Sequence, residues 1–171
     1  MVKETFLKLD STKQQRIKQA LLNEFSNYPL AHAQVARIVT DAQIARGAFY
    51  KYFEDLTDAY LYLYQLALSE IHHKFALQDI SSVKSAQLYL NEVKTFLDQT
   101  AKSPYFDLVK MHLSYNEVFL EKEHFLPEIT HPLPWAISTL SHQTIKECIK
   151  QPNKQPFLLQ RLEELLVKLL D

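Results

Sequence analysis

The chain contains a single glycine, Gly47, among its 171 residues. Glycine reaches positive φ at no steric cost, and sheet proteins with many tight turns depend on it. Hydrophobic residues make up 47% of the chain and charged residues 23%, which is the composition of a folded globular protein. We therefore predict an all-α fold, built as one compact unit or as two small helical modules that share a connecting helix.

Cysteine and histidine give no sign of a metal or catalytic centre. Cys148 is the only cysteine, which excludes an internal disulfide and a zinc site made of paired thiols. The adjacent His72 and His73 cannot share one helix face, and His124 and His131 flank prolines without a ligand-spaced partner. There is no Gly-rich phosphate loop and no nucleophile–base spacing. We predict no metal, no cofactor and no enzyme activity.

The N-terminus and the richest apolar run argue against export and membrane insertion. The first ten residues scatter four charges among apolar positions and lack the continuous apolar core of a signal peptide. Residues 59–68 are too few, and too interrupted by Gln65 and tyrosines, to span a bilayer. We expect a soluble protein of the reducing cytoplasm, with no membrane partner.

Charge is distributed unevenly along the chain. Residues 1–53 hold eight Lys or Arg against four Asp or Glu, a net +4, so the remainder carries −5 within a total of −1. A basic N-terminal part followed by an acidic remainder is expected when only the N-terminal part contacts phosphates. A split of this size also arises by chance, so it supports a nucleic-acid partner only weakly.

Apolar periodicity divides the chain into helices. Ser11 and Thr12 precede two glutamines at the spacing of a capping box, which predicts a first helix ending before Pro29. A two-turn stripe at 35–42 predicts a short second helix, and 45–53 a third. Later helices are expected at 56–75, 83–101 with a cap at Ser81 or Ser82, 105–122 after Pro104, 135–150 and 157–170, with an irregular connection at 124–134.

Two short helices joined by a tight turn, the second carrying basic and aromatic residues, are typical of a helix-turn-helix. If Ile44 and Phe49 point inward, the opposite side of the second helix displays four residues suited to DNA: Arg46, Gly47, Tyr50 and Lys51. Glycine costs about 1 kcal/mol relative to alanine within a helix, which indicates that something approaches the backbone closely. An ordinary helical hairpin in a core is the competing interpretation.

The segment Ile38-Val39 followed by residues 42–53 resembles the signature of the TetR family of regulators, most specifically in Gly-Ala-Phe-Tyr-Lys-Tyr-Phe at 47–53. The match covers residues 17–59, and beyond it only the number and order of helices agree. The resemblance implies a homodimeric, all-helical repressor with a ligand pocket in its C-terminal domain. By position it implies six DNA-binding residues: Arg46, Gly47, Ala48, Tyr50, Lys51 and, beside them, Tyr52.

Three positions depart from the family pattern. Gln43 stands where the turn usually has glycine, so it must adopt or avoid a left-handed conformation that costs about 1–2 kcal/mol. Gln34 replaces a threonine cap and is a weaker cap. Leu56 replaces a lysine, which should lower non-specific DNA affinity because one phosphate is no longer neutralised.

The resemblance implies two domains, a three-helix DNA-binding domain at 1–55 and a helical ligand-binding and dimerisation domain at 56–171, joined by a long helix. The last helix carries a broad leucine stripe, half of which can pack inward and half against a twin subunit. In the family the last two helices form the dimer interface, which here implies residues 135–150 and 157–170. A monomer with a buried terminal helix is the alternative.

The leading hypothesis is a homodimeric repressor on a palindromic double-stranded DNA operator, released by an unidentified small-molecule effector. A TetR-like regulator or interaction scaffold controlled by a protein partner, without a small molecule, is the second hypothesis. A helical enzyme using His112 or His124 is a third. Tyr60, Tyr62 and Tyr64 either face a ligand or pack in a buried helix.

Overall fold

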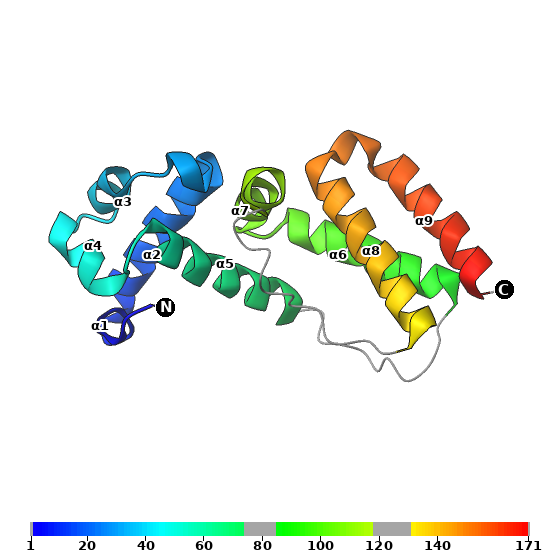
Figure 1. Cartoon of the computed structure of the whole chain (residues 1–171), viewed down its shortest axis with the longest axis horizontal. Helices are drawn as coiled ribbons and strands as arrows, with labels where there is room; N and C mark the ends of the chain where they lie inside the picture. Colours follow the sequence, from blue (N-terminus) through cyan, green and yellow to red (C-terminus); the bar gives the residue numbers. More distant parts are fainter. Residues whose placement is uncertain (1, 74–84, 118–130, 171) are drawn as a thin grey trace. The chain divides into compact units, whose positions relative to one another are not determined.

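The computed structural model describes residues 2–73, 85–117 and 131–170, and within these residues it contains helices and no strands (Figure 1). The prediction of an all-α fold is confirmed. The α-helices are α1 Glu4–Leu7, α2 Ser11–Asn27, α3 Val35–Asp41, α4 Arg46–Tyr52, α5 Leu56–His73, α6 Ala86–Ala101, α7 Phe106–Met111, α8 Pro132–Lys150 and α9 Gln155–Leu170. The short turns are η1 Leu30–His32, the π-helical η2 His112–Asn116 and η4 Pro152–Lys154.

The chain divides into two compact units. The first unit is Met1–His73 with Pro104–Phe119, and the second is Lys74–Ser103 with Leu120–Asp171. Helices α5 and α7 therefore pack with the N-terminal helices, whereas the predicted division lies at residues 55 and 56. That division into a DNA-binding part and a ligand-binding part concerns function, and it stays a prediction.

Helix α2 is the centre of the first unit. Its buried residues, Ile17, Ala20, Leu21, Glu24 and Phe25, recur at three- and four-residue spacing and so form one side of the helix. Helices α3, α5 and α7 all pack against α2. Burying each of the large apolar side chains on this side contributes about 1.5–3 kcal/mol, which makes α2 the element that holds the shorter helices in place.

The second unit is a bundle of α6, α8 and α9, each packed against the other two. Helices α8 and α9 run antiparallel and are joined through η4 (Figure 1). Helix α9 turns Leu158, Leu162 and Leu166 inward. None of the helices in the described residues is both long and apolar enough to cross a bilayer.

Several predicted helix ends are wrong. The capping box at Ser11 and Thr12 does not form, because Asp10 is the N-cap and accepts a hydrogen bond from the Lys13 backbone nitrogen at 2.9 Å. The short helix α1 before it was not expected. Helix α6 begins at 86 rather than 83, and its cap is Ser85, whose hydroxyl accepts from Leu88 N. The expected caps at 81 and 82 lie outside the described residues.

The prolines near residue 132 open a helix instead of interrupting the chain. Helix α8 begins at Pro132, three residues before the expected start, and includes Pro134 in its first turn. The first backbone nitrogens of a helix have no partner within it, so proline is tolerated there. The earlier part of the predicted connection, 124–130, lies outside the described residues, as do residues 118–122 of the helix expected to end at 122.

Candidate nucleic-acid interface

The turn between α3 and α4 contains a glutamine, Gln43, in the left-handed conformation. Gln43 has φ of 51°, the one positive φ of a non-glycine residue in the described part of the chain. Its backbone nitrogen donates to Thr40 O at 3.2 Å, and Ile44 N donates to Val39 O at 3.0 Å. These two bonds are the Schellman pattern that ends a helix and satisfies its last carbonyls. The chain thus makes this tight turn with a glutamine at the left-handed position instead of a glycine.

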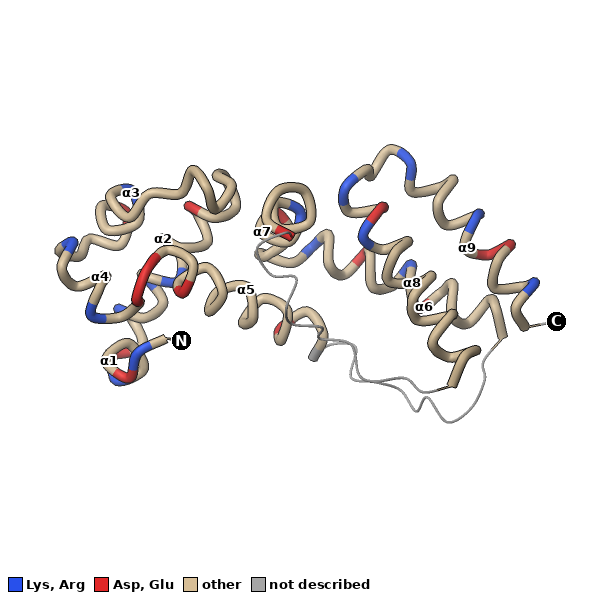
Figure 2. Tube along the Cα trace, viewed as in Figure 1, with Lys and Arg blue, Asp and Glu red and all other residues tan. Residues whose placement is uncertain are grey.

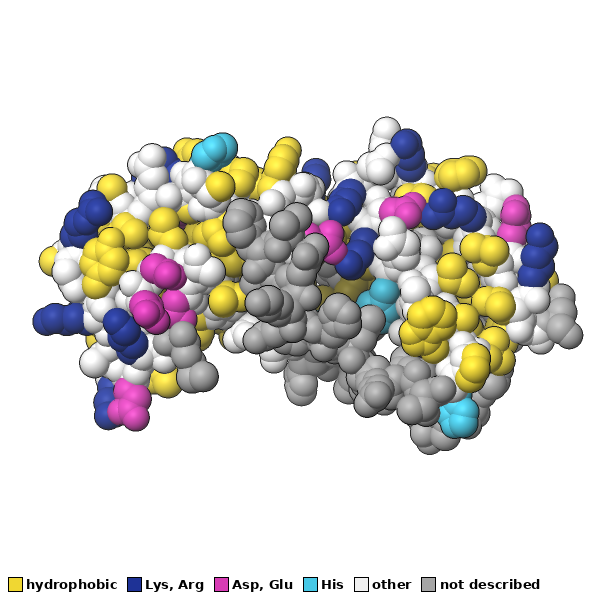
Figure 3. Space-filling view, viewed as in Figure 1, with side chains coloured by type: hydrophobic (Ala, Val, Ile, Leu, Met, Phe, Trp, Pro, Cys, Tyr) yellow, Lys and Arg dark blue, Asp and Glu magenta, His cyan; other side chains and the backbone are white. Residues whose placement is uncertain are grey.

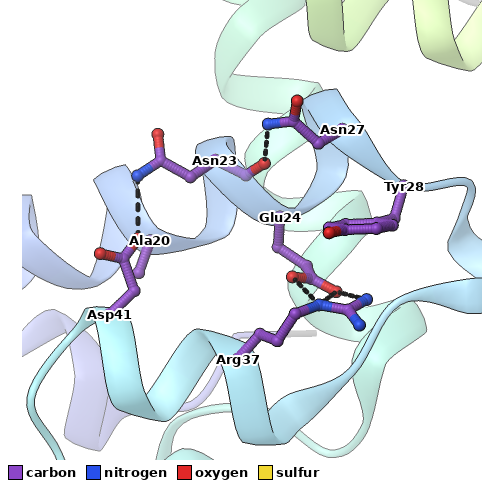
Figure 4. A pocket seen from close by; sticks show the side chains of 7 residues that line it. All are labelled: Ala20, Asn23, Glu24, Asn27, Tyr28, Arg37 and Asp41. Atoms are coloured by element: carbon purple, nitrogen blue, oxygen red, sulfur yellow. Dashed lines mark hydrogen bonds and ion pairs between the residues drawn. The ribbon is translucent and has the colours of Figure 1, made fainter.

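Helix α3 is fastened to α2 at its N-terminal end by a buried carboxylate. The cap residue Gln34 makes no side-chain capping bond, as expected for a weak cap. Instead, Glu24 Oε1 accepts from Gln34 N at 2.7 Å and from Arg37 Nη2 at 2.6 Å. Glu24 is 4% exposed, and the Arg37 guanidinium also lies 3.8 Å from the centre of the Tyr28 ring. Figure 4 shows Glu24 bonded to Arg37, with the Tyr28 ring beside the guanidinium.

Helix α4 has a buried side and an exposed side. Phe49 is fully buried, whereas Ile44, just before the helix, is only half buried. The exposed side brings together four of the predicted DNA-binding residues, Arg46, Gly47, Tyr50 and Lys51. A fifth, Ala48, is half buried beside them. Tyr50 is 43% exposed, with its ring edge-on to Phe49 at 5.3 Å.

The structure does not place Tyr52 on this exposed side, which corrects the predicted position of that residue. Tyr52 is 6% exposed, and its ring lies 5.9 Å from that of Phe6. The physical reason is helical spacing, because a residue three positions after the buried Phe49 lies on the same side of the helix. Tyr52 therefore contributes to the core of the first unit, and its role in DNA binding stays a prediction.

Arg46 and Lys51 form no hydrogen bond or ion pair through their side chains in the described part of the chain, and both are exposed. Figure 2 shows basic residues on α4. Since no residue in the described part of the chain neutralises either charge, both are available to an anionic partner. Phosphate is such an anion, and the neutral acceptor edge of guanine can accept hydrogen bonds from the same side chains.

Gly47 is not explained by the protein's own structure. Apart from its chain neighbours and the backbone of its own helix, a Cβ built at this position would have no atom of the described residues within 4 Å, and its φ is not positive. Neither internal packing nor backbone conformation therefore requires glycine here. The result is a stretch of bare helical backbone, facing outward between Arg46 and Tyr50, that a large partner can approach closely.

The N-terminus of α5 is acidic where the family has a lysine. Asp55 Oδ1 accepts from Asp58 N at 2.8 Å, and Asp58 Oδ2 accepts from Glu54 N at 3.0 Å. These reciprocal bonds cap the helix. Leu56 is half buried beside them and supplies no cation. The two aspartates therefore stabilise the start of α5, and Leu56 offers no positive charge to a phosphate.

Two pockets open on the first unit. One, about 350 Å³, lies over the Glu24–Arg37 pair, and Asn23 there donates to Asp41 at 2.8 Å (Figure 4). The polar side chains that line it bond one another. They are therefore explained by a structural role, which is to join α2 to α3. The other, about 420 Å³, reaches from η1 and α3 to Tyr50 and the start of α5. It lies next to the exposed side of α4 and extends that surface.

A buried polar cluster lies between α5 and the π-helical turn η2. The Tyr60 hydroxyl and His112 Nδ1 are 2.8 Å apart, and the ring centres of Tyr64 and His112 are 4.0 Å apart. Burial raises the pKa of both tyrosines. Tyr60 and Tyr64 are packed in the core, and His112 is buried with them rather than lining either pocket. His124, the other histidine of the enzyme hypothesis, lies outside the described residues.

Asn116 in the same turn has a role that the sequence did not reveal. Its Oδ1 accepts from the backbone nitrogen of Leu30 at 3.0 Å, and its side chain is fully buried. Leu30 opens η1, whose first nitrogen has no partner within its own turn. Asn116 therefore caps, from 86 residues away, the segment that leads into α3.

No protein-family model matches the sequence, and no curated protein matches it. Two solved structures are similar to it. One is a TetR family transcriptional regulator from Chloroflexus aurantiacus, 20% identical, with a TM-score of 0.59 over 99% of this chain and 96% of that one. The other is SCO4942 from Streptomyces coelicolor, a candidate transcriptional regulator, 16% identical, with a TM-score of 0.61 over 90% and 97%. The chain therefore adopts the all-α fold of TetR family transcriptional regulators, which is the fold that the signature at residues 42–53 implies.

Proposed function

We propose that the chain is a sequence-specific DNA-binding transcriptional regulator and not an enzyme. The observation that carries the proposal is the exposed side of α4. Among the residues that the structure describes, the side chains of Arg46 and Lys51 have no partner there, and no contact or backbone conformation requires glycine at Gly47. An α-helix fits the major groove of B-DNA, and a helix with bare backbone can enter it more closely. Both structural neighbours are described as transcriptional regulators or candidates for that role.

Each residue on this side has a chemical role suited to DNA. Arg46 can bond guanine through two nitrogens or pair with a phosphate, and the Tyr50 hydroxyl can donate to a phosphate oxygen. Lys51 supplies a point charge, and the methyl group of Ala48 suits an apolar contact such as the thymine methyl. Gly47 permits the close approach on which these contacts depend. In this proposal Tyr52 supports the helix from the core.

The test is selection of binding sites from random double-stranded DNA, followed by affinity measurements on the selected site. We expect Arg46→Ala and Tyr50→Phe each to weaken binding by about fivefold to a hundredfold, as loss of a base or phosphate contact does. Lys94→Ala and Tyr115→Phe are matched controls, because both residues are exposed and belong to elements other than the helix-turn-helix, α6 and η2. Unchanged binding by both α4 variants would show that the assigned surface is wrong.

We further propose that the protein acts as a homodimer through α8 and α9. Helix α9 buries one leucine stripe within its own unit and leaves other large apolar side chains outside. Phe157 is 63% exposed, Trp135 on α8 is 57% exposed, and Leu165 and Leu169 are each more than a third exposed. Figure 3 shows hydrophobic side chains at the surface of this unit. A second copy would cover them, and a two-fold dimer reads a palindromic operator.

Oligomeric state measured by sedimentation tests the dimer. Phe157→Glu and Leu165→Glu should shift the protein toward monomer, because each would bury an unpaired charge in the interface. Leu88→Glu is the matched control, since Leu88 is an exposed leucine on α6. If the variants on α9 and the control behave alike, the interface lies elsewhere.

Repression that is released by a small molecule completes the proposal. An effector can act only if its affinity differs between the DNA-binding form and the released form. A thermal-stability screen with a broad metabolite library, followed by DNA-release assays on each hit, tests this part. If the screen yields no hits and a second protein is found that binds this one and changes its affinity for DNA, control by a protein partner would be favoured.

A further inference from the structure

Helix α4 is too short to hold its own shape. It has seven residues, about two turns, and isolated helices of this length are unstable in water. Its N-cap, Ala45, has no side chain that can cap it, and Gly47 weakens its first turn. The burial of Phe49 fixes the middle of the helix. Its C-terminal turn, which carries Tyr50 and Lys51, needs a separate means of support.

The last four carbonyl groups of α4 all have partners, and three of those partners lie at the N-terminus of the chain. Phe53 N donates to Phe49 O at 2.9 Å, which is the last bond within the helix. Lys3 Nζ then donates to Tyr50 O at 2.9 Å, and Lys3 N donates to Tyr52 O at 3.0 Å. The Thr5 hydroxyl donates to Lys51 O. Carbonyls at a helix end otherwise depend on water or on a C-cap.

An aromatic anchor holds this N-terminal segment against α4. Phe6 is fully buried, and its ring lies 5.1 Å from Phe53 and 5.3 Å from Tyr62, in addition to its contact with Tyr52. Such ring pairs add about 0.5–1.5 kcal/mol to the burial of each ring. Because Phe6 cannot leave this site without exposing a large apolar surface, Lys3 and Thr5 are kept close to the carbonyls that they bond.

We propose that residues 3–6 form a clip that positions the C-terminal turn of the DNA-reading helix, with Lys3 and Thr5 as positioning residues. This inference rests on the proposed DNA-binding function of α4. Lys3 is well suited to the role, because its charge lies at the negative end of the helix and its bond to a carbonyl is charge-assisted. Its ammonium group is committed to Tyr50 O, so it acts on DNA through the placement of Tyr50 and Lys51.

The test uses Lys3→Met, which removes the ammonium group and keeps the backbone bond to Tyr52, and Thr5→Val, which keeps the shape and removes the hydroxyl. Each should weaken binding to the selected DNA site by about threefold to tenfold, as the loss of one such hydrogen bond does. Lys8→Met is the charge-matched control, because Lys8 is the C-cap of α1 and its ammonium group bonds Glu4, the first residue of that helix, rather than a carbonyl of α4. Thr12→Val is the control for an exposed threonine.

Salt dependence separates positioning from direct phosphate contact. A lysine that contacts a phosphate contributes about 0.9 to the slope of log affinity against log salt concentration. We expect Lys3→Met to lower affinity and leave this slope unchanged, whereas Lys51→Met should reduce it. A reduced slope for Lys3→Met would identify Lys3 as a phosphate contact and overturn the clip, as would equal losses of affinity in Lys3→Met and Lys8→Met.

Amide hydrogen exchange on the full chain without DNA gives a second readout. We expect faster exchange in residues 50–54 of Lys3→Met and Thr5→Val, with exchange in α2 unchanged, because only the last turn of α4 loses support. Unchanged exchange at 50–54 in both variants would also overturn the clip. If the wild-type protein selects no DNA sequence, the proposed function fails while the exchange measurement still decides whether the clip exists.

Discussion

The two short helices of the helix-turn-helix are held in different ways. Helix α3 is fastened at its N-terminal end by the buried carboxylate of Glu24, which bonds both the backbone of Gln34 and the guanidinium of Arg37. Helix α4 has no such attachment at its start and is held by Phe49 and by the bonds at its last turn. The difference indicates that α3 is a support, whereas α4 keeps its first turn and one whole side free for a partner.

Glu24→Gln should produce the largest loss of stability. The amide keeps one acceptor for Gln34 N but loses the charge that Arg37 bonds, and it turns a donor toward the guanidinium. We expect the free energy of unfolding to fall by about 2–3 kcal/mol, measured by urea denaturation, because bonds to a buried charge are lost. Glu4→Gln, which alters an exposed pair with Lys8, should cost less than about 0.5 kcal/mol. Equal losses would contradict the support role of α3.

Asn116→Ala should have the next largest effect, because it removes the cap of η1 ahead of α3. The buried Leu30 N–H would be left without a partner, which costs about 1–3 kcal/mol in the free energy of unfolding. Asn153→Ala, at an exposed asparagine in η4, is the control. A loss as small as that of the control would show that the η1 segment does not depend on Asn116.

Gly47→Ala should separate stability from DNA binding. The added methyl group enters open space on a helix, so the free energy of unfolding should rise by up to about 1 kcal/mol. Affinity for the selected DNA site should fall in the same variant, because the methyl group stands between the backbone and the groove. Parallel measurements of urea denaturation and DNA binding test this. A gain in both quantities would show that DNA does not approach the helix at Gly47.

Features that depend on residues close together in the sequence could be predicted, whereas features that depend on distant residues could not. The bounds of α3 and α4 and the exposure of Arg46, Tyr50 and Lys51 follow from apolar spacing over a few residues. Tyr52 was misplaced although its three-residue distance from Phe49 was a local sign of burial.

The supports of these helices were not predictable in the same way. Glu24 bonds residues 10 and 13 positions away, Lys3 bonds a carbonyl 47 positions away, and Asn116 caps a nitrogen 86 positions away. Each is a single polar side chain whose partner is a backbone group or a distant cation. Such a residue produces no periodic pattern, so only the folded chain identifies it.

Gln43→Gly should have the smallest effect and tests the turn that joins the two helices. At φ of 51° a glutamine is strained, and glycine would relieve that strain while adding freedom to the unfolded chain. Relief of strain stabilises the folded state, whereas the added freedom stabilises the unfolded state. We therefore expect a net gain of up to about 1 kcal/mol in the free energy of unfolding. Gln43→Ala should show no such gain, because alanine keeps the Cβ that causes the strain. The backbone bonds of the turn involve no side chain of Gln43, so DNA affinity should be unchanged in both variants. A change in DNA affinity without a change in stability would mean that Gln43 itself meets the DNA.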